Sequence, residues 1–411
     1  MKVIKVLLKS LLYMALTFVV LVLLFSIFVP SYSFDEPKSF SGTYLHNPYK
    51  DMNPDNWIQS NFHAHTRRFV GLTNGRANTN EMVDSVYSSL GFQHVGISDY
   101  NTINYYDSAN PSFVPTYEHG YGVFKIHQLC LGADKVQPID YFLFQNLSMK
   151  QHTLNRLSKH ARFVVLAHPS FVKKGYLVED MKYLSNYKLM EVLNGFGIST
   201  EHWDKALSNG HLVYLIGNDD SHDVTNVSEV AKRFTMINAP ENDAELLLQA
   251  LENGNTVGVD FQLRENETLK KKIQRLEKDL PYIRQVELRG DTLLISASKK
   301  IGTIKFIGQD GKELDVQKRQ DTAMYVLQPE DAYVRCVLMF SCGTTLFLNP
   351  ITRHESEDIV KQRLDKINYP KTIMLWMVYA VIVGFIVIGG LRGFRGNRGK
   401  RGNRGLKGGV R

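Results

Sequence analysis

Short apolar runs alternate with amphipathic stretches from about residue 61 to residue 260. The apolar runs read as strands, and they cover residues 94–99, 124–133, 161–169, 189–195, 212–220 and 234–238. The stretches between them place apolar residues at helical spacing, over residues 79–91, 149–161, 199–210 and 241–254. Alternation of strands and helices predicts a parallel sheet or a (β/α) barrel.

The pattern changes to a period of two after residue 281. Residues 265–280 form a charged helical stretch that Pro281 closes. From residue 282 to residue 351, apolar and polar residues alternate, and Gly-Asp and Asp-Gly pairs mark turns. This pattern predicts a small antiparallel β domain.

Two uncharged apolar runs lie near the ends of the chain, and each is long enough to span a bilayer. The first covers residues 11–29, and the lysines before it also fit a signal peptide. This run is longer than a usual signal core, and no clear small-x-small cleavage site follows it. An uncleaved anchor is therefore the favoured interpretation. The second run covers residues 373–391, with Trp376 and Tyr379 near its start, as is common at membrane interfaces.

Charge is concentrated outside these two runs. The tail after residue 391 holds eight basic residues and no acid, which equals the whole formal net charge of +8. The main domain is therefore not expected to bind nucleic acid. The positive-inside rule predicts that both ends are cytoplasmic and that residues 30–371 lie outside the cell membrane. An RNA-binding tail is the alternative to a basic tail that rests on anionic lipid, and lipid contact is the favoured interpretation.

The three cysteines are not expected to form a structural disulfide. Cys336 and Cys342 lie in what reads as one strand or hairpin, and on one strand their Cα atoms would be about 20 Å apart. None of the three lies in a zinc-like CxxC pair.

Residues that can bind metal recur at the ends of the predicted strands. They are His63, His65, Asp99, Glu118, His119, His127, His168, Glu191, Asp219, Asp220 and His222. The loops after barrel strands converge on one face, so these side chains are expected to meet. Each has an ordinary alternative: His127 could bond a buried backbone group, and the Asp-Asp-Ser-His sequence could cap a helix. Their recurrence at successive strands nevertheless indicates a bound ion.

The ordered motifs NFHAHT, GISDYNTI, LAHPS, EVLNG and GNDDSH resemble those of the PHP (polymerase and histidinol phosphatase) superfamily. The resemblance covers about residues 57–260. It implies a distorted (β/α)7 barrel that holds up to three metal ions, commonly zinc, manganese or iron, and hydrolyses phosphate esters. The later segment 333–351 is similar to the β-sandwich appended to some secreted or membrane members.

The resemblance also implies a set of ligands. One metal would take His63, His65, Glu118 and Asp220. A second would share Glu118 as a bridge and add His127 and His168. His222 would belong to a third site, and Asp99 is a further candidate ligand.

The chain departs from the family pattern at the third site. The second motif usually reads Asp-His, whereas this chain has Asp99 followed by Tyr100. The ligand expected shortly after the HxH pair is also missing, and only Asn74 lies beyond it, at a longer spacing. We therefore expect two divalent transition-metal ions per chain.

These features predict a membrane-anchored, extracytoplasmic metal-dependent phosphoesterase. Arg67 and Arg68 could bind the substrate phosphate, although either could instead be a solvent-facing charge. Tyr100 could donate a hydrogen bond, and His222 could act as general acid. The substrate would be a phosphorylated small molecule or an envelope polymer. The alternative is a catalytically degenerate PHP-like binding or scaffold protein of the cell envelope.

The predicted organisation follows the chain in order. It comprises an N-terminal transmembrane anchor (1–30), a linker (31–56), a PHP-type metal-binding barrel (57–262), a charged helix linker (263–281), a β-sandwich domain (282–356), a linker (357–372), a C-terminal transmembrane helix (373–391) and a basic disordered tail (392–411).

Overall fold

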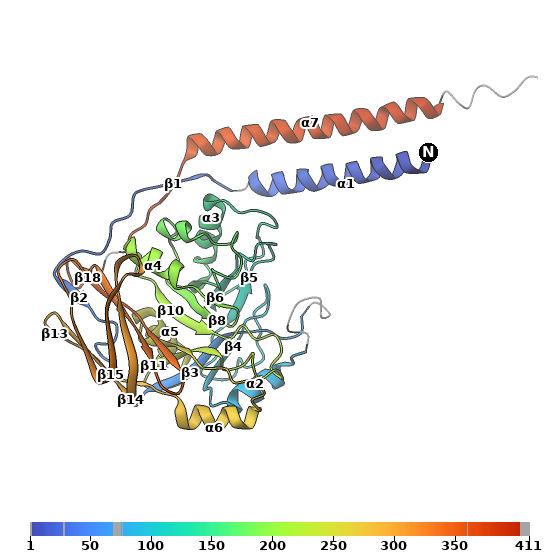
Figure 1. Ribbon diagram of the computed structural model, residues 1–411. Coiled ribbons are helices and arrows are strands. Elements are labelled where there is room, and N and C mark those ends of the chain that lie inside the picture. Colours follow the sequence, from blue (N-terminus) through green and yellow to red (C-terminus); the bar gives the residue numbers. More distant parts are fainter. Residues whose placement is uncertain (1, 28, 69–74, 76, 360, 403–411) are drawn as a thin grey trace, which may run out of the picture. The chain divides into compact units, whose positions relative to one another are not determined.

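The computed structural model describes residues 2–27, 29–68, 75, 77–359 and 361–402 (Figure 1). The chain divides into two compact units. One comprises residues 1–33, 148–152 and 366–411, and the other comprises residues 34–147 and 153–365.

Two long helices make up most of the first unit. They are α1 (Lys2–Ile27) and α7 (Tyr369–Gly402). Each contains a segment long and apolar enough to cross a membrane, Ile4–Val22 in α1 and Tyr369–Gly389 in α7. Just beyond α1, the Ser31 backbone N–H donates to the Thr372 hydroxyl of α7 at 2.9 Å. Segments that precede and follow the second unit in the sequence are thus hydrogen-bonded to each other within the first unit.

The second unit is a mixed α/β structure. Its helices are α2 (Asn80–Ser89), α3 (Leu147–Leu157), which crosses the boundary between the units, α4 (Thr200–Ser208), α5 (Ala244–Asn253) and α6 (Leu269–Asp279). Side chains cap several of them: Thr79 accepts from the Met82 N–H before α2, and Asp243 accepts from the Glu245 N–H before α5.

The strands of this unit form two sheets. The first has the order β10 (Tyr214–Asn218), β8 (Leu189–Asn194), β7 (Ala161–Leu166), β6 (Gln128–Ala133) and β5 (Thr116–His119), with β9 (Gly197–Ile198) paired to β8. The second has the order β13 (Ile283–Arg289), β14 (Thr292–Ile307), β16 (Tyr333–Met339), β17 (Thr345–Leu348), β12 (Thr256–Asp260), β11 (Arg233–Asn238), β3 (Trp57–Ala64) and β4 (His94–Ile97). Off this path lie β15 (Glu313–Val326), β18 (Ile351–His354) and β2 (Tyr44–His46). A short separate pair joins β1 (Tyr32–Phe34) to β19 (Asp365–Ile367).

Both sheets are mixed, whereas strand–helix alternation alone predicts a parallel sheet or a (β/α) barrel. Strands β7, β8 and β10 run parallel, as do β3 and β4. In contrast, β6 is antiparallel to both β5 and β7, and β11 is antiparallel to both β3 and β12. Strands β5 and β6 are antiparallel because the connection between them is short, whereas a parallel pair needs a crossover of a dozen or more residues.

Strand pairing also runs across the boundary that the sequence pattern suggested near residue 281. Strand β12 pairs with β17 in antiparallel register, from Val257 opposite Leu348 to Asp260 opposite Thr345. A single buried apolar cluster contains Val259 from one side of this boundary and Leu346 from the other. The C-terminal strands, drawn in orange in Figure 1, therefore extend the sheet that carries β3. The predicted domain limits themselves stay predictions.

Candidate metal centre

The HxH pair lies at the end of β3, in the interior of the unit. His63 and His65 are both almost fully buried. Because alternate residues of a strand face the same side, their imidazoles meet, and the two Nε2 atoms are 3.1 Å apart. Two ring nitrogens held this close in the interior need a proton or a cation between them or beside them.

Two carboxylates complete a four-atom cluster around these nitrogens. Asp220 Oδ1 lies 3.2 Å from Nε2 of both His63 and His65. Glu118 Oε2 lies 3.3 Å from His65 Nε2 and 3.6 Å from His63 Nε2. Tetrahedral ligands around a zinc-sized ion are about 3.3 Å apart when the metal–ligand bonds are about 2.0–2.1 Å. These separations therefore match the edges of a tetrahedral metal site.

Glu191 holds His63 in the orientation that this site needs. Its Oε1 lies 2.9 Å from His63 Nδ1 and accepts from Asn218 Nδ2 at 2.9 Å. Its Oε2 accepts from the His168 backbone N–H and from Asn194 Nδ2, each at 2.9 Å. With a proton on Nδ1 directed to Glu191, the Nε2 lone pair of His63 faces the cluster.

The other oxygen of Glu118 faces two more histidines. Glu118 Oε1 lies 2.6 Å from His127 Nδ1 and 3.1 Å from His168 Nε2. The antiparallel pairing of β5 with β6 brings Glu118 and His127 together. Gly120 permits this approach, because a Cβ there would lie only 2.5 Å from the His127 ring. The two oxygens of Glu118 therefore face different pairs of histidines.

Several polar atoms at the centre are buried and have no hydrogen-bond partner among the described residues. They are His65 Nδ1, Glu118 Oε2, His127 Nε2, His168 Nδ1, Asp220 Oδ1 and His222 Nε2. Buried polar atoms are normally paired, so a concentration of unpaired ones indicates a missing ligand. Imidazole nitrogens and carboxylate oxygens suit zinc, manganese or iron, so the donor set fits a divalent metal.

The charges at the centre are strongly coupled. Burial opposes protonation of His65, but Asp220 and Glu118 outweigh it and raise its pKa to about 9. The same carboxylates raise the pKa of His63 and His168 against the effect of burial. Although burial favours the neutral acids, the histidines hold the pKa of Glu118 and Asp220 below the usual carboxyl range. A bound divalent cation would take the place of the protons that balance these carboxylates.

The backbone at two candidate ligands is unusual. His168 has φ +31° and Asp220 has φ +53°, in the left-handed region that residues with a Cβ rarely occupy. Strained backbone of this kind concentrates at functional sites, where the surrounding contacts hold it.

Tyr100 and His222, which the resemblance associates with a third site, both lie against the ring of His65. The ring of Tyr100 lies parallel to that of His65, with centroids 4.6 Å apart. His222 lies on His65 at the same centroid distance, and its Nδ1 is 2.7 Å from the Asp220 backbone oxygen. Burial and the charges of Glu118 and Asp220 raise the pKa of the Tyr100 phenol, which keeps it neutral. Asn74 lies outside the described residues.

Asp99 lies beside the centre in a separate network. Its carboxylate accepts from the Thr66 N–H at 2.8 Å, from Arg68 Nε at 2.7 Å and from Asn104 Nδ2 at 2.9 Å. Its role as a metal ligand stays a prediction, and in this arrangement it holds the segment that follows the HxH pair. Arg67 is exposed, and the structure gives its side chain no contact with the cluster.

Some polar residues at the predicted strand ends form hydrogen bonds outside the four-atom cluster. His119 Nδ1 pairs with Gln128 Oε1 at 2.7 Å. Asp219 accepts from Tyr87 and from the backbone N–H groups of residues 231–233. Glu191 is able to bind metal by residue type, but the structure pairs its carboxylate with His63 Nδ1, a partner 128 residues away that no local pattern indicates. All three cysteines are free.

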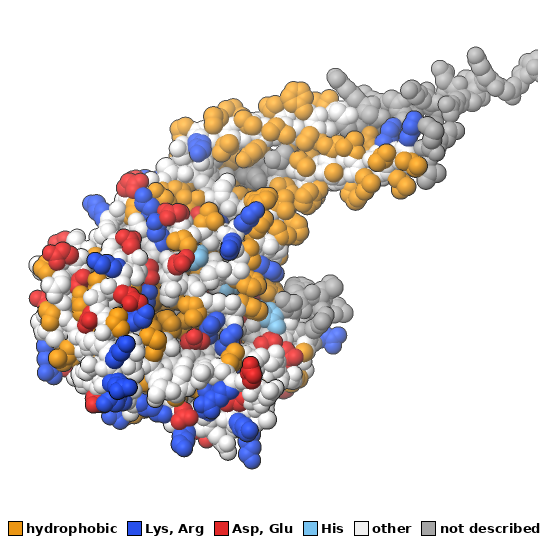
Figure 2. Space-filling model, in the orientation of Figure 1, with side chains coloured by type: hydrophobic (Ala, Val, Ile, Leu, Met, Phe, Trp, Pro, Cys, Tyr) orange, Lys and Arg blue, Asp and Glu red, His pale blue; other side chains and the backbone are white. Residues whose placement is uncertain are grey.

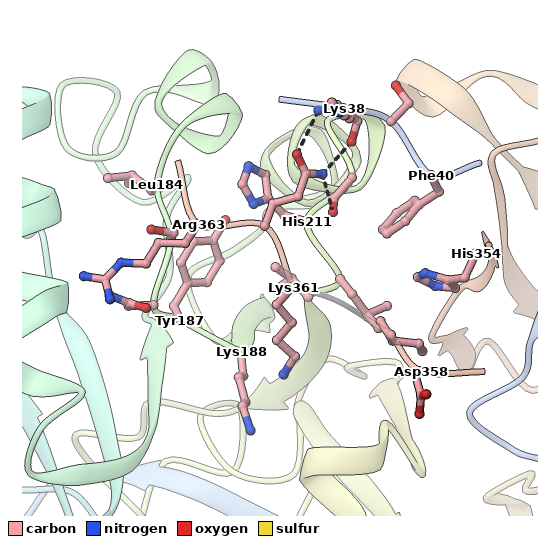
Figure 3. A pocket seen from close by; sticks show the side chains of 18 of the residues that line it. Lys38, Phe40, Leu184, Tyr187, Lys188, His211, His354, Asp358, Lys361 and Arg363 are labelled. Atoms are coloured by element: carbon pink, nitrogen blue, oxygen red, sulfur yellow. Dashed lines mark hydrogen bonds between the residues drawn. The ribbon is translucent and has the colours of Figure 1, made fainter. Parts of the chain in front are cut away.

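A cavity of about 580 Å³ lies apart from these ligands (Figure 3). None of the candidate ligands is among its lining residues. Its wall includes the N-terminal segment at Lys38 and the C-terminal segment at Gln362, which bond each other: the Lys38 N–H donates to Gln362 Oε1 at 2.8 Å. Lys188 and Lys361 also line it. This cavity is not part of the candidate metal centre.

Comparisons with known proteins give one structural likeness. It is to a two-domain protein from Bacteroides vulgatus ATCC 8482 that contains a predicted PHP-like metal-dependent phosphoesterase. The two are 13% identical, and the alignment covers 79% of this chain and 93% of the other, with a TM-score of 0.37. No family model and no curated protein matches the chain.

Proposed function

We propose that this protein is a membrane-anchored, extracytoplasmic phosphoesterase that depends on divalent metal ions. The observation that carries the proposal is the four-atom cluster of His63, His65, Glu118 and Asp220. Five of its interatomic separations lie between 3.1 and 3.6 Å. We further propose that the metal-binding region is a distorted (β/α)7 barrel and that the C-terminal strands form a sandwich domain.

Two ions are proposed, bridged by Glu118, with His127 and His168 at the second. Bound ions of this kind lower the pKa of a water molecule and polarise a phosphoryl group. The protein's own contribution is to hold six ligands in a buried cluster and to fix the orientation of His63 through Glu191. Zinc, manganese and iron all suit these donors.

His222 is proposed as the residue that transfers a proton to the leaving group. Its side chain is only slightly exposed, so it lies between the cluster and solvent. Its Nδ1 faces the Asp220 carbonyl at 2.7 Å, and its Nε2 has no partner among the described residues. Burial lowers the pKa of His222, so the protonated ring is a stronger acid than a free imidazolium and passes its proton on readily once protonated. Arg67 is proposed to bind the substrate phosphate from the exposed edge.

A scaffold function is the second candidate, and one observation favours it. Tyr100 fills the place where the family pattern has a third-site histidine, so part of that chemistry is absent. A protein of the cell envelope that keeps metal for its fold would tolerate this change.

The test uses the full chain in lipid nanodiscs, loaded separately with zinc, manganese or iron. Turnover of a chromogenic phosphodiester and a phosphomonoester is measured for the parent, for Asp220→Ala and for His160→Ala. His160 pairs with Asp134 at the surface and is a matched control. We expect the parent and His160→Ala to hydrolyse at least one ester and Asp220→Ala to hydrolyse none. A fully metal-loaded parent without turnover on a broad panel of esters would support the scaffold.

A further inference from the structure

Exposed apolar side chains lie on the surface next to the metal centre. Six of them, each between 38% and 69% exposed, are here called the rim: Tyr121, Val123, Phe144, Phe171, Phe196 and Ile198. Large apolar side chains gathered on a surface indicate a site of interaction. Figure 2 shows hydrophobic and histidine side chains next to one another on the displayed surface.

The rim is continuous with the candidate ligands. The Phe171 ring lies 5.5 Å from that of His168 and 4.9 Å from that of Phe196, between ring centroids. Phe196 in turn lies 5.7 Å from His222. Ile198 is joined to the same surface, since its carbonyl accepts from Ser170 Oγ at 3.4 Å. A molecule that contacts Phe171 and Phe196 would therefore also lie next to His168 and His222.

The rest of the rim lies on the loop between Glu118 and His127 or packs against it. Tyr121 and Val123 lie on this loop, and the Val123 N–H donates to the Phe142 carbonyl at 2.9 Å. Phe144 stacks on Phe124, with centroids 4.7 Å apart. A Cβ at Gly175 would lie 2.8 Å from the Phe124 carbonyl, so the loop after Phe171 packs directly on this one.

The charged residues near the rim indicate which kind of surface the rim binds. The two loops, residues 120–126 and 170–177, carry exposed Lys125, Lys173 and Lys174 and no acidic residue. Aromatic and aliphatic side chains interspersed with lysine are the pattern of surfaces that lie in the interfacial region of an anionic bilayer.

The chain is itself expected to be anchored in a bilayer. Helices α1 and α7 each contain a segment long and apolar enough to cross a membrane. The chain between Ile27 at the end of α1 and Phe34 at the start of the second unit can extend at most about 25 Å. A bilayer that holds α1 is therefore within reach of the unit that carries the rim.

We propose that the rim binds the interfacial region of an anionic lipid bilayer and that the phosphoester delivered to the metal centre is part of a lipid headgroup. The second half of this statement rests on the proposed phosphoesterase function, whereas membrane contact of the rim does not. In this arrangement the rim side chains enter the headgroup boundary to a depth of about 5–10 Å.

Fluorescence of the full chain in nanodiscs tests membrane contact without using activity. In a Cys342→Ser background, an environment-sensitive dye is attached at Val123→Cys, Phe196→Cys or, as a control, Val316→Cys. Val316 is an exposed apolar residue of β15, outside the rim. Brominated lipids quench dyes that enter the bilayer. We expect a blue shift and loss of more than about half of the fluorescence at positions 123 and 196 and little change at 316.

Further measurements identify what surrounds the dye at the rim. Quenching should be stronger in discs with anionic lipid, and the Lys173→Glu, Lys174→Glu double substitution should remove that difference. No quenching at positions 123 and 196 overturns the proposal. A blue shift without quenching shows that protein, such as a second copy of the chain, covers the rim, and it also overturns the proposal.

Hydrolysis then separates this inference from the proposed function. The same discs are assayed for release of a lipid headgroup phosphate and for turnover of a soluble phosphodiester. Quenching together with lipid turnover supports both parts. Quenching without turnover of any ester keeps the membrane contact and overturns the phosphoesterase. Turnover of the soluble ester with lipid untouched keeps the phosphoesterase and overturns the lipid substrate.

Discussion

His63 and Glu191 form a buried pair in which Nδ1 lies 2.9 Å from Oε1. Glu191 comes from β8 and His63 from β3, so the pair connects the two sheets of the unit. It directs Nδ1 of the imidazole to a carboxylate and leaves Nε2 for the metal cluster. The carboxylate thereby affects metal binding without touching the metal.

Glu191→Gln should weaken metal binding while the fold persists. Glutamine keeps the shape of the side chain but loses the charge that favours the required imidazole tautomer. Loss of such an orienting group typically lowers metal affinity by about 10- to 100-fold. Competition with a chelating dye measures the affinity. Glu267→Gln is the matched control, because Glu267 is similarly buried and pairs with Arg275 away from the ligands. Equal affinities in the two variants would contradict the orienting role.

The metal content of variants should divide the ligands into two sets. The parent is expected to bind two ions per chain. His168→Ala should lose one ion, since it belongs only to the second set, and His63→Ala should chiefly affect the first. Glu118→Gln should lose both, because its two oxygens face different histidines. Elemental analysis after metal-replete purification gives the counts. Full retention of both ions by Glu118→Gln would exclude the bridge.

Tyr100→His should add a ligand for a third ion. The Tyr100 ring stacks on His65 and lies 5.7 Å from the His127 ring, between centroids, so an imidazole at residue 100 would lie beside two candidate ligands. Calorimetric titration should show a further, weaker binding event, weaker because one expected ligand is still missing. Tyr100→Phe removes only the hydroxyl and should bind the same number of ions as the parent. An additional ion in Tyr100→Phe would show that the tyrosine merely blocks a complete site.

Stability of the metal-free chain should depend on pH above neutrality. The folded pKa of His65 is about 9, raised from 6.5. Its stabilising contribution is complete below about pH 6.5 and is lost as pH rises through about 9, with a total on the order of 2–3 kcal/mol. Thermal unfolding in chelator should therefore shift to lower temperature between pH 6.5 and pH 9.

Zinc should remove this dependence, because a neutral imidazole binds metal and the proton is no longer needed. His65→Gln is expected to flatten the profile in chelator. A metal-free midpoint that rises with pH across this window would have the opposite sign to the prediction.

Membrane topology can be tested separately from chemistry. A reporter fused after Arg411 should be cytoplasmic, and one inserted near Ser298 should be external, because basic residues flank both apolar segments on the same side. Accessibility to a membrane-impermeant reagent measures each position. A mature N-terminus near Phe34 would contradict an uncleaved anchor.

The sequence by itself determined the local elements and the chemical type of the centre. Predicted strands at 161–169, 189–195 and 234–238 overlap β7, β8 and β11, because apolar periodicity depends on neighbours along the chain. His63, His65, Glu118 and Asp220 could be listed as able to bind metal from their residue types and their positions at predicted strand ends. Their grouping into one ligand set came from the resemblance of the motifs to the PHP superfamily.

Only the tertiary structure decided which partners those residues have. Glu118 meets His168 fifty residues away, and His63 meets Glu191 across 128 residues, through strand pairings that no local pattern specifies. The antiparallel β5–β6 pairing, the sheet shared by β12 and β17, and the bonds that occupy Asp99 have the same origin. Strand order and register depend on how the whole apolar surface is buried, so long-range contacts follow from the completed fold rather than from any one segment.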